Sequence, residues 1–391
     1  MSSVYILGAK RTALGALMGQ FTGVPATQLG ATAIQAAMTQ ANVSGEQIDE
    51  VIMGCVLPAG LGQAPARQAA LAAGIAAKAG ATTINKVCGS GMKAVMFAHD
   101  AIKAGSAQCV VAGGMESMTN APHLLMGSRT GIRFGSAEMI DHMAFDGLTN
   151  PYDKQPMGVF GELCVTKYGF SREQQDAFAA ESVQRALNAQ QSGAFSAEIA
   201  PVTVSTRKGE TLVSSDEQPG KCDIGKIPTL RPAFKKDGTI TAASSSSIND
   251  GAAALVLSSE AFANAHGLVA IAKIVAQASF SQAPEWFTTA PIGAIQSVLL
   301  KAGWEIADVD LFEINEAFAT VAMAPIHELG IAHERVNVNG GACALGHPIG
   351  ASGARILVTL IHALQARGLR KGVASLCIGG GEATAMAIEL L

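Results

Sequence analysis

A cysteine stands where its sulfur could act as a nucleophile. Cys88 lies within residues 85–91, NKVCGSG, at the point where a predicted strand ends and an amphipathic helix begins. The amino end of a helix stabilises a thiolate. The glycines permit a tight turn whose amides could hold an oxyanion beside the sulfur. The motif alone fits nucleophilic catalysis and a buried structural cysteine about equally well.

A histidine in a glycine-rich segment offers a base for that thiol. His347 lies within residues 339–353, NGGACALGHPIGASG, outside any apolar periodicity and just ahead of a predicted helix. An imidazole beside a thiol is the usual means of activating it. A lone histidine is more often structural, so this motif alone leaves both interpretations open.

Two more polar groups follow apolar strands. Cys377 ends the last long strand and is followed by Ile378 and the glycines that begin at Gly379, and Asn315 follows an earlier strand. Ligand-facing residues of α/β sheets gather at such strand ends. Cys377 could form a disulfide, bind a metal or transfer a proton. Asn315 could cap a helix, or hold a water or an amide toward a reacting carbonyl.

Composition excludes several classes of function. The net charge of −4 and the absence of a long run of Lys or Arg argue against nucleic acid as a partner. No apolar stretch reaches the length of a membrane span without glycine or charge, and we expect no targeting segment. The seven cysteines are widely spaced without a CxxC pair, which indicates reduced thiols in a cytoplasmic protein and no metal.

An internal repeat predicts how these groups are positioned. Residues 47–54 resemble residues 308–315, so that Asp49 pairs with Asp310 and Gly54 with Asn315. Continuing in that register, Gly91 matches Gly353 within one residue, and each begins a segment with apolar residues at helical spacing. Each predicted helix ends at a glycine, Gly105 or Gly368, and a short apolar strand follows.

The repeat also places the histidine relative to the nucleophile. His347 lies three positions before the residue that matches Cys88, so the two loops could face each other across a pseudo-twofold axis. Between Thr119 and Ala243 the pattern changes, with one clear helix predicted over residues 172–191. We interpret the chain as a first half of residues 1–119 plus 244–269, an inserted segment 120–243 and a second half 270–391.

These four blocks together, in this order and spacing, resemble the thiolase family from Val4 to the C-terminus. The resemblance implies an α/β fold with a duplicated five-layered αβαβα core and an inserted loop domain that binds coenzyme A. It also implies an acyltransferase that catalyses the reversible Claisen condensation of two acetyl-CoA to acetoacetyl-CoA and CoA, or thiolysis of a 3-ketoacyl-CoA. Residues 113–118, GGMESM, look like the short-chain, biosynthetic type.

The resemblance assigns a role to each reactive group. Cys88 carries the acyl group, His347 activates it, and Cys377 moves the proton on the α-carbon of the second thioester. One oxyanion site comes from His347 and a water held by Asn315, and the other from the backbone amides of Cys88 and Gly379. Acyl-CoA and coenzyme A are then the partners, no cofactor is implied, and the family habit predicts a homotetramer built as a dimer of dimers.

The resemblance also identifies a substrate pocket, lined by Met157, Ser246, Phe287, Ala317 and Phe318. The phenylalanines and the methionine could equally be core, and Ser246 a flexible linker. Basic side chains of the insert could meet the coenzyme phosphates or simply be solvated: Arg207, Lys208, Lys221 and Lys226. The sequence departs from the family pattern at Pro156, near Gly220 and at Cys343.

Other functions remain open at this level. A broad-range degradative 3-ketoacyl-CoA thiolase of fatty-acid β-oxidation would use the same residues with a roomier pocket. A catalytically silent scaffold or lipid-binding member of the fold need not retain Cys88, His347, Asn315 and Cys377 together. A disulfide between Cys88 and Cys377 that stops catalysis is a further hypothesis.

Overall fold

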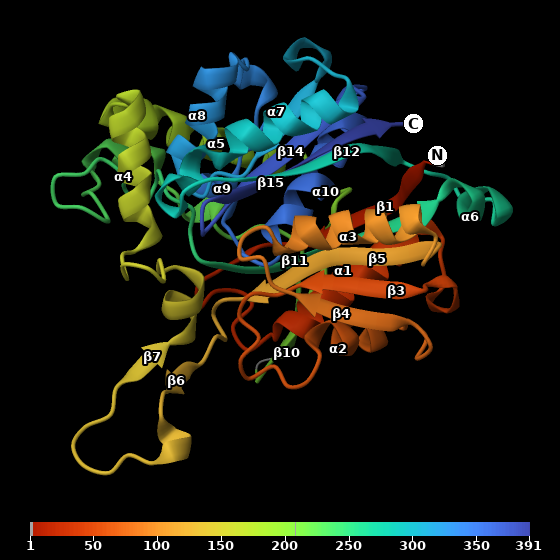
Figure 1. The fold of residues 1–391 in the computed structure, drawn as a ribbon, viewed down its shortest axis with the longest axis horizontal. Coiled ribbons are helices and arrows are strands. Elements are labelled where there is room, and N and C mark those ends of the chain that lie inside the picture. The colour runs from red at the N-terminus through yellow and green to blue at the C-terminus, as the bar shows by residue number, and fades with distance from the viewer. Residues whose placement is uncertain (1–2, 208) are drawn as a thin grey trace.

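A single long sheet runs through the protein (Figure 1). The structure is a computed structural model that describes residues 3–207 and 209–391. The strand order is β13-β14-β15-β12-β1-β11-β5-β3-β4, and β2 pairs with β11 and β8 with β1. The strands are β1 (Val4–Thr12), β2 (Gly15–Ala16), β3 (Glu50–Gly54), β4 (Gly80–Ile84), β5 (Cys109–Ser117), β8 (Ile199–Ala200), β11 (Asn249–Ser259), β12 (Ala272–Ser281), β13 (Leu311–Ile314), β14 (Lys371–Ile378) and β15 (Glu382–Leu390).

The sheet consists of two halves joined at one short seam. The strands β4, β3, β5, β11 and β1 form the first half, and β12, β15, β14 and β13 form the second. At the seam β1 pairs antiparallel with β12, from Val4 opposite Ile274 to Ile6 opposite Ala272. In Figure 1, β1, β3, β4 and β5 of the first half are red to orange, and β14 and β15 of the second half are blue.

Helices cover the outer face of each half and fill the space between the halves. α1 and α2 pack outside the first half, and α7 and α8 outside the second, whereas α3 and α10 pack between them. The bounds are α1 (Ala26–Ala41), α2 (Pro65–Ala72), α3 (Ser90–Ala104), α7 (Ala290–Ala302), α8 (Ala319–Leu329) and α10 (Ser352–Arg367). The five-layered αβαβα arrangement implied by the resemblance is confirmed.

Both faces of the sheet in the first half are covered by helices, and the side chains of its strands alternate between the two faces. On β5, Cys109 and Val111 pack toward α1, whereas Val110 and Ala112 pack toward α3 and α10. Successive side chains of a strand point to opposite faces, so a strand covered on both sides needs a continuous apolar run. The continuous apolar run in the sequence therefore fits a strand that helices cover on both faces.

Equivalent hydrogen bonds in the two halves reflect the internal repeat. Asp49 Oδ2 accepts the backbone N–H of Gln108 at 2.7 Å and of Cys109 at 3.0 Å. Asp310 Oδ2 does the same in the second half, with Arg370 at 2.9 Å and Lys371 at 2.8 Å. The two aspartates thus hold the beginning of β5 and of β14 in equivalent ways.

The helices α3 and α10 approach each other closely where they begin. A Cβ atom at Gly91 would lie 2.8 Å from the backbone nitrogen of Ala354, and one at Gly353 would lie 2.4 Å from that of Met92. Only glycine allows these backbones to approach so closely. The loops that precede the two helices are therefore brought together at the centre of the molecule.

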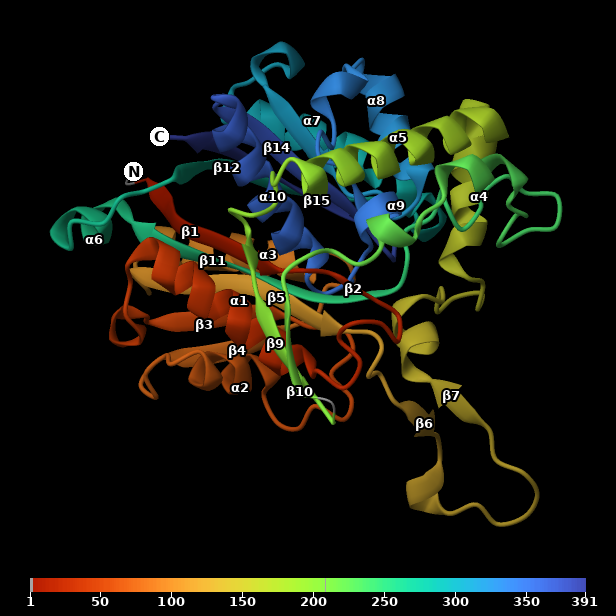
Figure 2. The ribbon, with the colours of Figure 1, turned by 180° about the vertical axis from the view of Figure 1, so that it is seen from behind.

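The segment between β5 and β11 lies largely outside the central sheet and contains one helix that the sequence did not predict. The predicted helix is α5 (Arg172–Gln191), and the missed one is α4 (Met157–Tyr168), whose first turns contain Gly158 and Gly161. Figure 2 shows α5 and the β9–β10 hairpin on the far side of the molecule. The remaining elements are β6 (His123–Leu125), β7 (Met139–Asp141), β9 (Val202–Thr206), β10 (Gly209–Val213), α6 (Glu260–Ala265) and α9 (Ala342–Leu345).

A buried ion-pair network ties this segment to the first half. Arg11 on β1 lies 2.5 Å from Glu198 and 2.7 Å from Asp216, and all three side chains are buried. β8 also pairs with β1, so part of the segment 120–243 joins the central sheet. The division into an inserted domain 120–243 therefore stays a prediction. Within residues 3–207 and 209–391, no helix has the length and hydropathy needed to cross a membrane.

Candidate active site

Cys88 sits in a tight turn that its neighbours fix before α3 begins. Val87 adopts a φ of +46°, which is uncommon for a β-branched residue. Its N–H donates to Asn85 Oδ1 at 2.8 Å, and its carbonyl accepts from Ser90 Oγ at 2.7 Å. The Ser90 hydroxyl in turn accepts the N–H of Lys86 at 2.8 Å. The strained turn presents the sulfur at the edge of the sheet rather than inside it.

The environment of the Cys88 sulfur favours the protonated thiol. Burial raises the pKa of Cys88 to about 11, although the backbone N–H groups of Gly379 and of Cys88 itself lower it by hydrogen bonding. The sequence suggested a thiolate stabilised by the helix end, and at this position burial outweighs that effect. The thiol therefore needs a base to become a nucleophile near neutral pH.

His347 is held in the state that such a base requires. Its Nδ1 lies 2.5 Å from Ser352 Oγ, and that hydroxyl donates its only hydrogen to the carbonyl of Pro348 at 2.9 Å. The hydroxyl must then accept a hydrogen from Nδ1, which leaves Nε2 unprotonated. Nε2 is buried and has no partner among the described residues. Burial, together with the charge of Arg355, lowers the pKa of His347 to about 3, so the ring is neutral.

The loop that carries His347 is fixed from the first half. The His347 N–H donates to Asn249 Oδ1 at 3.1 Å. Glu116, at the end of β5, accepts the N–H of Gly350 at 2.8 Å and those of Val56 and Leu57 at 3.0 and 3.1 Å. Burial raises the pKa of Glu116 to about 7. Sequence reasoning gave Glu116 no role, because its partners are distant backbone amides.

Cys377 lies beside Cys88 at the end of β14. A Cβ atom at Gly89 would lie 2.3 Å from Ile378 Cδ1, so the two cysteine turns are in direct contact. The pKa of Cys377 is well above its usual value, because the thiol is buried and a charge on Cys88 would repel a thiolate there. All seven cysteines, Cys88 and Cys377 included, are free thiols in this structure.

An apolar cluster surrounds Cys377. It contains four of the residues that the sequence placed in the substrate pocket, Met157, Phe287, Ala317 and Phe318. The rings of Phe287 and Phe318 lie 6.5 Å apart in an edge-to-face arrangement. The fifth predicted residue, Ser246, donates its N–H to the carbonyl of Ala317 at 3.0 Å. The structure therefore brings all five to one place.

Asn315 and Gly379 directly follow the neighbouring strands β13 and β14. The Asn315 side chain is buried, and its Nδ2 has no partner among the described residues. Gly379 lies next to Val87 and Met157, since a Cβ atom there would be 3.7 Å and 3.5 Å from their side chains. Cys88 also packs beside Ile349 in the His347 loop. The five predicted reactive groups come from both halves, and the turns of Cys88, Cys377 and Gly379 lie next to one another.

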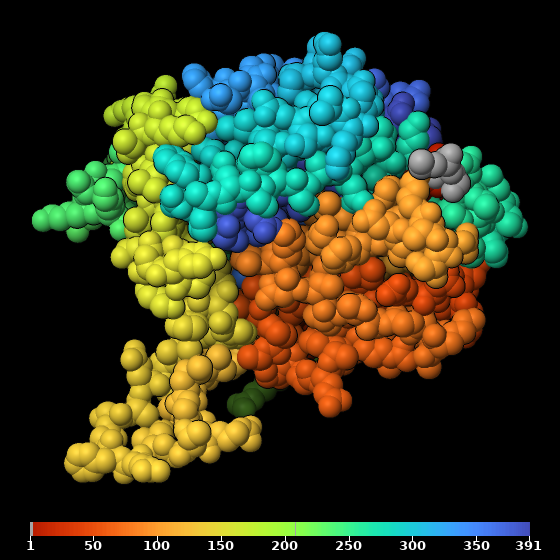
Figure 3. Space-filling view, viewed as in Figure 1, coloured from red at the N-terminus to blue at the C-terminus, as the bar shows by residue number. Residues whose placement is uncertain are grey.

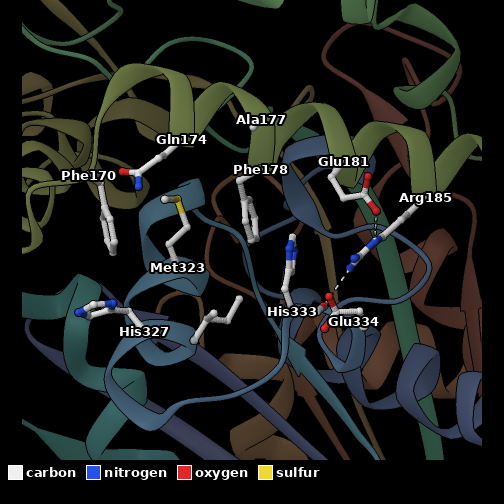
Figure 4. A pocket seen from close by; sticks show the side chains of 11 residues that line it. Phe170, Gln174, Ala177, Phe178, Glu181, Arg185, Met323, His327, His333 and Glu334 are labelled. Atoms are coloured by element: carbon white, nitrogen blue, oxygen red, sulfur yellow. Dashed lines mark hydrogen bonds and ion pairs between the residues drawn. The ribbon is translucent and has the colours of Figure 1, made fainter.

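A cleft of about 340 Å³ opens at this place. It is lined by Val87, Met157, Gly379 and Gly380, and on its outer side by residues 145–154 of the inserted segment. A larger cavity, of about 660 Å³, lies elsewhere, between α5 and α8. Figure 4 shows that Phe178 and His333 stack within it, and none of the predicted reactive residues lines it. Cavity size alone would therefore not have located the predicted residues.

The basic residues of the insert remain candidates for phosphate contacts. Lys221 pairs with Glu217 at 2.6 Å and Lys226 with Asp223 at 3.0 Å. Both lysines line a cavity of about 300 Å³ together with Cys222 and Cys343. Arg207 is exposed, and Lys208 lies outside the described residues. No group of three or more His, Cys, Asp or Glu in the described chain is arranged to hold a metal ion.

Comparison with known proteins identifies the class. The family model of the thiolase N-terminal domain matches residues 4–261, and that of the thiolase C-terminal domain matches residues 268–390. Together they cover nearly the whole chain. The protein belongs to the thiolase family.

Individual relatives are similar over their full length. The chain is 50% identical to an acetyl-CoA acetyltransferase of Escherichia coli, with 100% of each chain covered. It is 52% identical to acetyl-CoA acetyltransferase 2 of Arabidopsis thaliana, over 99% of this chain and 97% of the relative. The crystal structure of the Bacillus anthracis acetyl-CoA acetyltransferase superposes with a TM-score of 0.97 at 41% identity, over 100% of this chain and 99% of that one. A thiolase from Ascaris suum in complex with coenzyme A superposes with a TM-score of 0.94 at 43% identity, with both chains fully covered.

Proposed function

We propose that this thiolase is an acetyl-CoA C-acetyltransferase, which interconverts two acetyl-CoA with acetoacetyl-CoA and CoA. The observation that supports the proposal is a pair of buried thiols in touching turns, accompanied by a neutral imidazole and an unpartnered amide, with a cleft lined by their chain neighbours Val87 and Gly379. The names of the full-length relatives support it, since at about 50% identity they are acetyl-CoA acetyltransferases.

The first half of the reaction transfers an acetyl group to Cys88. His347 Nε2 removes the thiol proton as the sulfur attacks the thioester carbonyl, and CoA leaves with a proton. The backbone N–H groups of Cys88 and Gly379, which hydrogen-bond the Cys88 sulfur before the reaction, stabilise the oxyanion. One such donor is worth about 3 kcal/mol when it is aimed at the developing charge. The raised pKa of Cys88 makes the proton transfer concurrent with attack.

The second half forms the carbon–carbon bond. Once CoA has left with the first proton, His347 Nε2 takes the proton of Cys377, and the resulting Cys377 thiolate removes a proton from the methyl group of the second acetyl-CoA. The enolate oxygen is held by His347 Nε2–H and by Asn315 Nδ2, directly or through a water. The enolate carbon attacks the acetyl group on Cys88, the bond to the sulfur breaks as the sulfur takes the proton from His347 Nε2, and acetoacetyl-CoA is released. Two thiols in different surroundings divide the roles of nucleophile and base.

The pocket around Cys377 suits a short acyl group on a pantetheine arm. Met157, Phe287 and Phe318 fill the space beside the thiol with apolar surface, which excludes water from the enolate and strengthens its hydrogen bonds. Coenzyme A thioesters are substrates in this scheme, and every proton is moved by side chains of the chain itself. No metal or organic cofactor takes part in it.

We also propose a homotetramer in the cytoplasm. The β6–β7 arm, residues 123–141, projects from the body of the molecule (Figure 3) and exposes Met126, Ile132, Phe134 and Met139. An apolar arm of this kind is typical of a contact between copies. Free, widely spaced thiols are typical of a reducing compartment. Light scattering of the wild type and of Phe134→Glu tests the assembly, and a smaller wild-type particle would contradict it.

Thiolysis of acetoacetyl-CoA, measured against 3-ketooctanoyl-CoA for the wild type and Cys88→Ala, tests the activity. We expect fast cleavage of the short substrate and its loss in the variant. Preference for the longer substrate would instead identify a degradative thiolase. Cleavage of neither by a folded wild type would contradict an enzymatic role.

A further inference from the structure

The amide of Asn315 can serve the reaction only if its nitrogen, and not its oxygen, faces the substrate. A side-chain amide can rotate, and the two ends have nearly the same shape but opposite hydrogen-bonding character. An oxygen facing the enolate would repel it, whereas a nitrogen donates to it. Something in the protein must therefore select one orientation.

Arg355 on α10 is the group in contact with that amide. Its Nη2 lies 3.4 Å from Asn315 Oδ1, and both side chains are buried. A guanidinium has only donors, so it can face the amide oxygen but not the amide nitrogen. Asn315 Nδ2 is thereby turned away from Arg355, and it is the atom that has no partner among the described residues.

The position of Arg355 follows from the helix and strand that meet here. Arg355 lies three residues after Ser352, so the two side chains share one face of the first turn of α10. On the other side Glu313 and Asn315 share one face of the chain at the end of β13. Glu313 Oε2 lies 3.6 Å from Arg355 Nη1, in a buried ion pair.

That ion pair does not by itself explain why an arginine is buried here. Both carboxylate oxygens of Glu313 and the Nη1 and Nε atoms of Arg355 lack a hydrogen-bond partner among the described residues. A buried pair with unsatisfied atoms recovers little of its desolvation cost, and an apolar pair of similar volume is often as stable. The contact with Asn315 explains why an arginine is placed at this position.

We propose that Arg355 is a positioning residue of the reaction, which holds the Asn315 amide so that Nδ2–H points at the enolate oxygen. One helix turn then orients both donors of that oxyanion site, because Ser352 fixes His347 and Arg355 fixes Asn315. The inference rests on the proposed function. It concerns the carbon–carbon bond step and not the acetylation of Cys88, whose oxyanion is held by backbone amides.

The two steps can be measured separately. Exchange of labelled CoA into acetyl-CoA requires only acetylation of Cys88 and its reversal, whereas thiolysis of acetoacetyl-CoA requires the carbon–carbon step. Arg355→Met keeps an unbranched stem that reaches about as far as Nε and removes every donor. We expect thiolysis kcat to fall about 10²-fold, comparable to the loss of one oxyanion donor, with KM little changed. Exchange should stay within about threefold of the wild type.

Matched variants exclude a purely structural effect. Arg367→Met is the control, since Arg367 lies on the same helix and donates to Asn339 Oδ1 at 3.0 Å, a similar arginine–amide contact outside the site. Arg355→Lys should recover part of the activity, because an ammonium still donates to the amide oxygen. In an Asn315→Ala background, Arg355→Met should cause no further loss of thiolysis.

The outcomes that overturn the inference are distinct from failure of the proposed function. If thiolysis and exchange fall together in Arg355→Met, or if its loss multiplies with that of Asn315→Ala, Arg355 does not act through Asn315. Should the variant not fold, Glu313→Gln combined with Arg355→Met removes the unpaired carboxylate, and the same two rates decide. A wild type that exchanges CoA but cannot cleave acetoacetyl-CoA would contradict the proposed function instead.

Discussion

The two halves of the molecule begin their central helices in the same way and use the preceding loops differently. Both α3 and α10 start at a serine followed by a glycine. Ser90 bonds the backbone of its own turn and so holds Cys88, whereas Ser352 bonds the imidazole of His347. Residues shared by the repeat build the scaffold, and the residues that differ are the ones to which we assign the chemistry.

The difference also explains why neither half suffices. Cys88 belongs to the first half, whereas His347, Asn315 and Cys377 belong to the second. The position of Cys88 corresponds to Gly350 in the second half, and Gly350 donates its N–H to Glu116 of the first. The proposed active site therefore draws its residues from both halves, and a hydrogen bond between the halves holds its loops together.

The largest effect is expected when the Cys377 thiol is removed and the Cys88 thiol is kept. Cys377→Ala should lower thiolysis kcat by at least about 10³-fold, since no other group is placed to transfer the α-proton. Acetylation of Cys88 should persist, because that step uses His347 and backbone amides. Mass spectrometry after incubation with acetyl-CoA would detect the acetylated peptide. Cys109→Ala, a buried cysteine on β5, is the control, and loss of acetylation in Cys377→Ala would contradict this division of roles.

The equivalent serines should respond differently to the same substitution. Ser352→Ala removes the group that fixes the His347 tautomer, so kcat should fall about 10²-fold with a small change in melting temperature. Ser90→Ala removes two hydrogen bonds of a buried turn and should lower the free energy of unfolding by about 1–3 kcal/mol. Steady-state kinetics and thermal melts of both variants distinguish the two. Equal kinetic losses would mean that both serines serve only the scaffold.

The pH dependence of Cys88 alkylation sharpens the contrast between thiol and imidazole. Burial places the pKa of Cys88 at about 11 and that of His347 at about 3, so no thiolate–imidazolium pair exists at rest. Only the thiolate reacts with iodoacetamide, and its rate should rise about tenfold per pH unit between about pH 7 and 9. A rate independent of pH over this range would reveal a preformed ion pair.

The smallest effect is expected at the aspartates that the halves share. Asp49→Ala and Asp310→Ala each remove a carboxylate that accepts two backbone N–H groups. Each should lower the free energy of unfolding by about 1–2 kcal/mol, with kcat unchanged. Denaturant unfolding measures this, and Asp→Asn at each position keeps one acceptor and should lose less. A change in kcat at only one of them would break the equivalence.

The sequence by itself determined the local elements and their order. Helix α5 has the predicted bounds, and α3 and α10 end at Gly105 and Gly368, where φ is +78° and +64°. These features depend on residues close together in the chain, namely apolar spacing and glycines that adopt a left-handed conformation. Helix α4 escaped prediction because Gly158 and Gly161 interrupt its pattern, and Phe234 and Ile240 pack against those positions only in the folded chain.

Only the tertiary structure decided how the reactive groups are tuned. The motifs named Cys88, His347, Cys377 and Asn315, but the protonation of the thiol depends on burial, which no local pattern records. The orienting partners, Glu116, Ser352 and Arg355, act on atoms of other segments. Glu116 holds the His347 loop from 234 residues away, and Arg355 reaches Asn315 across 40. Residue types limit which chemistry is possible, whereas desolvation and long-range hydrogen bonds set its protonation state and direction.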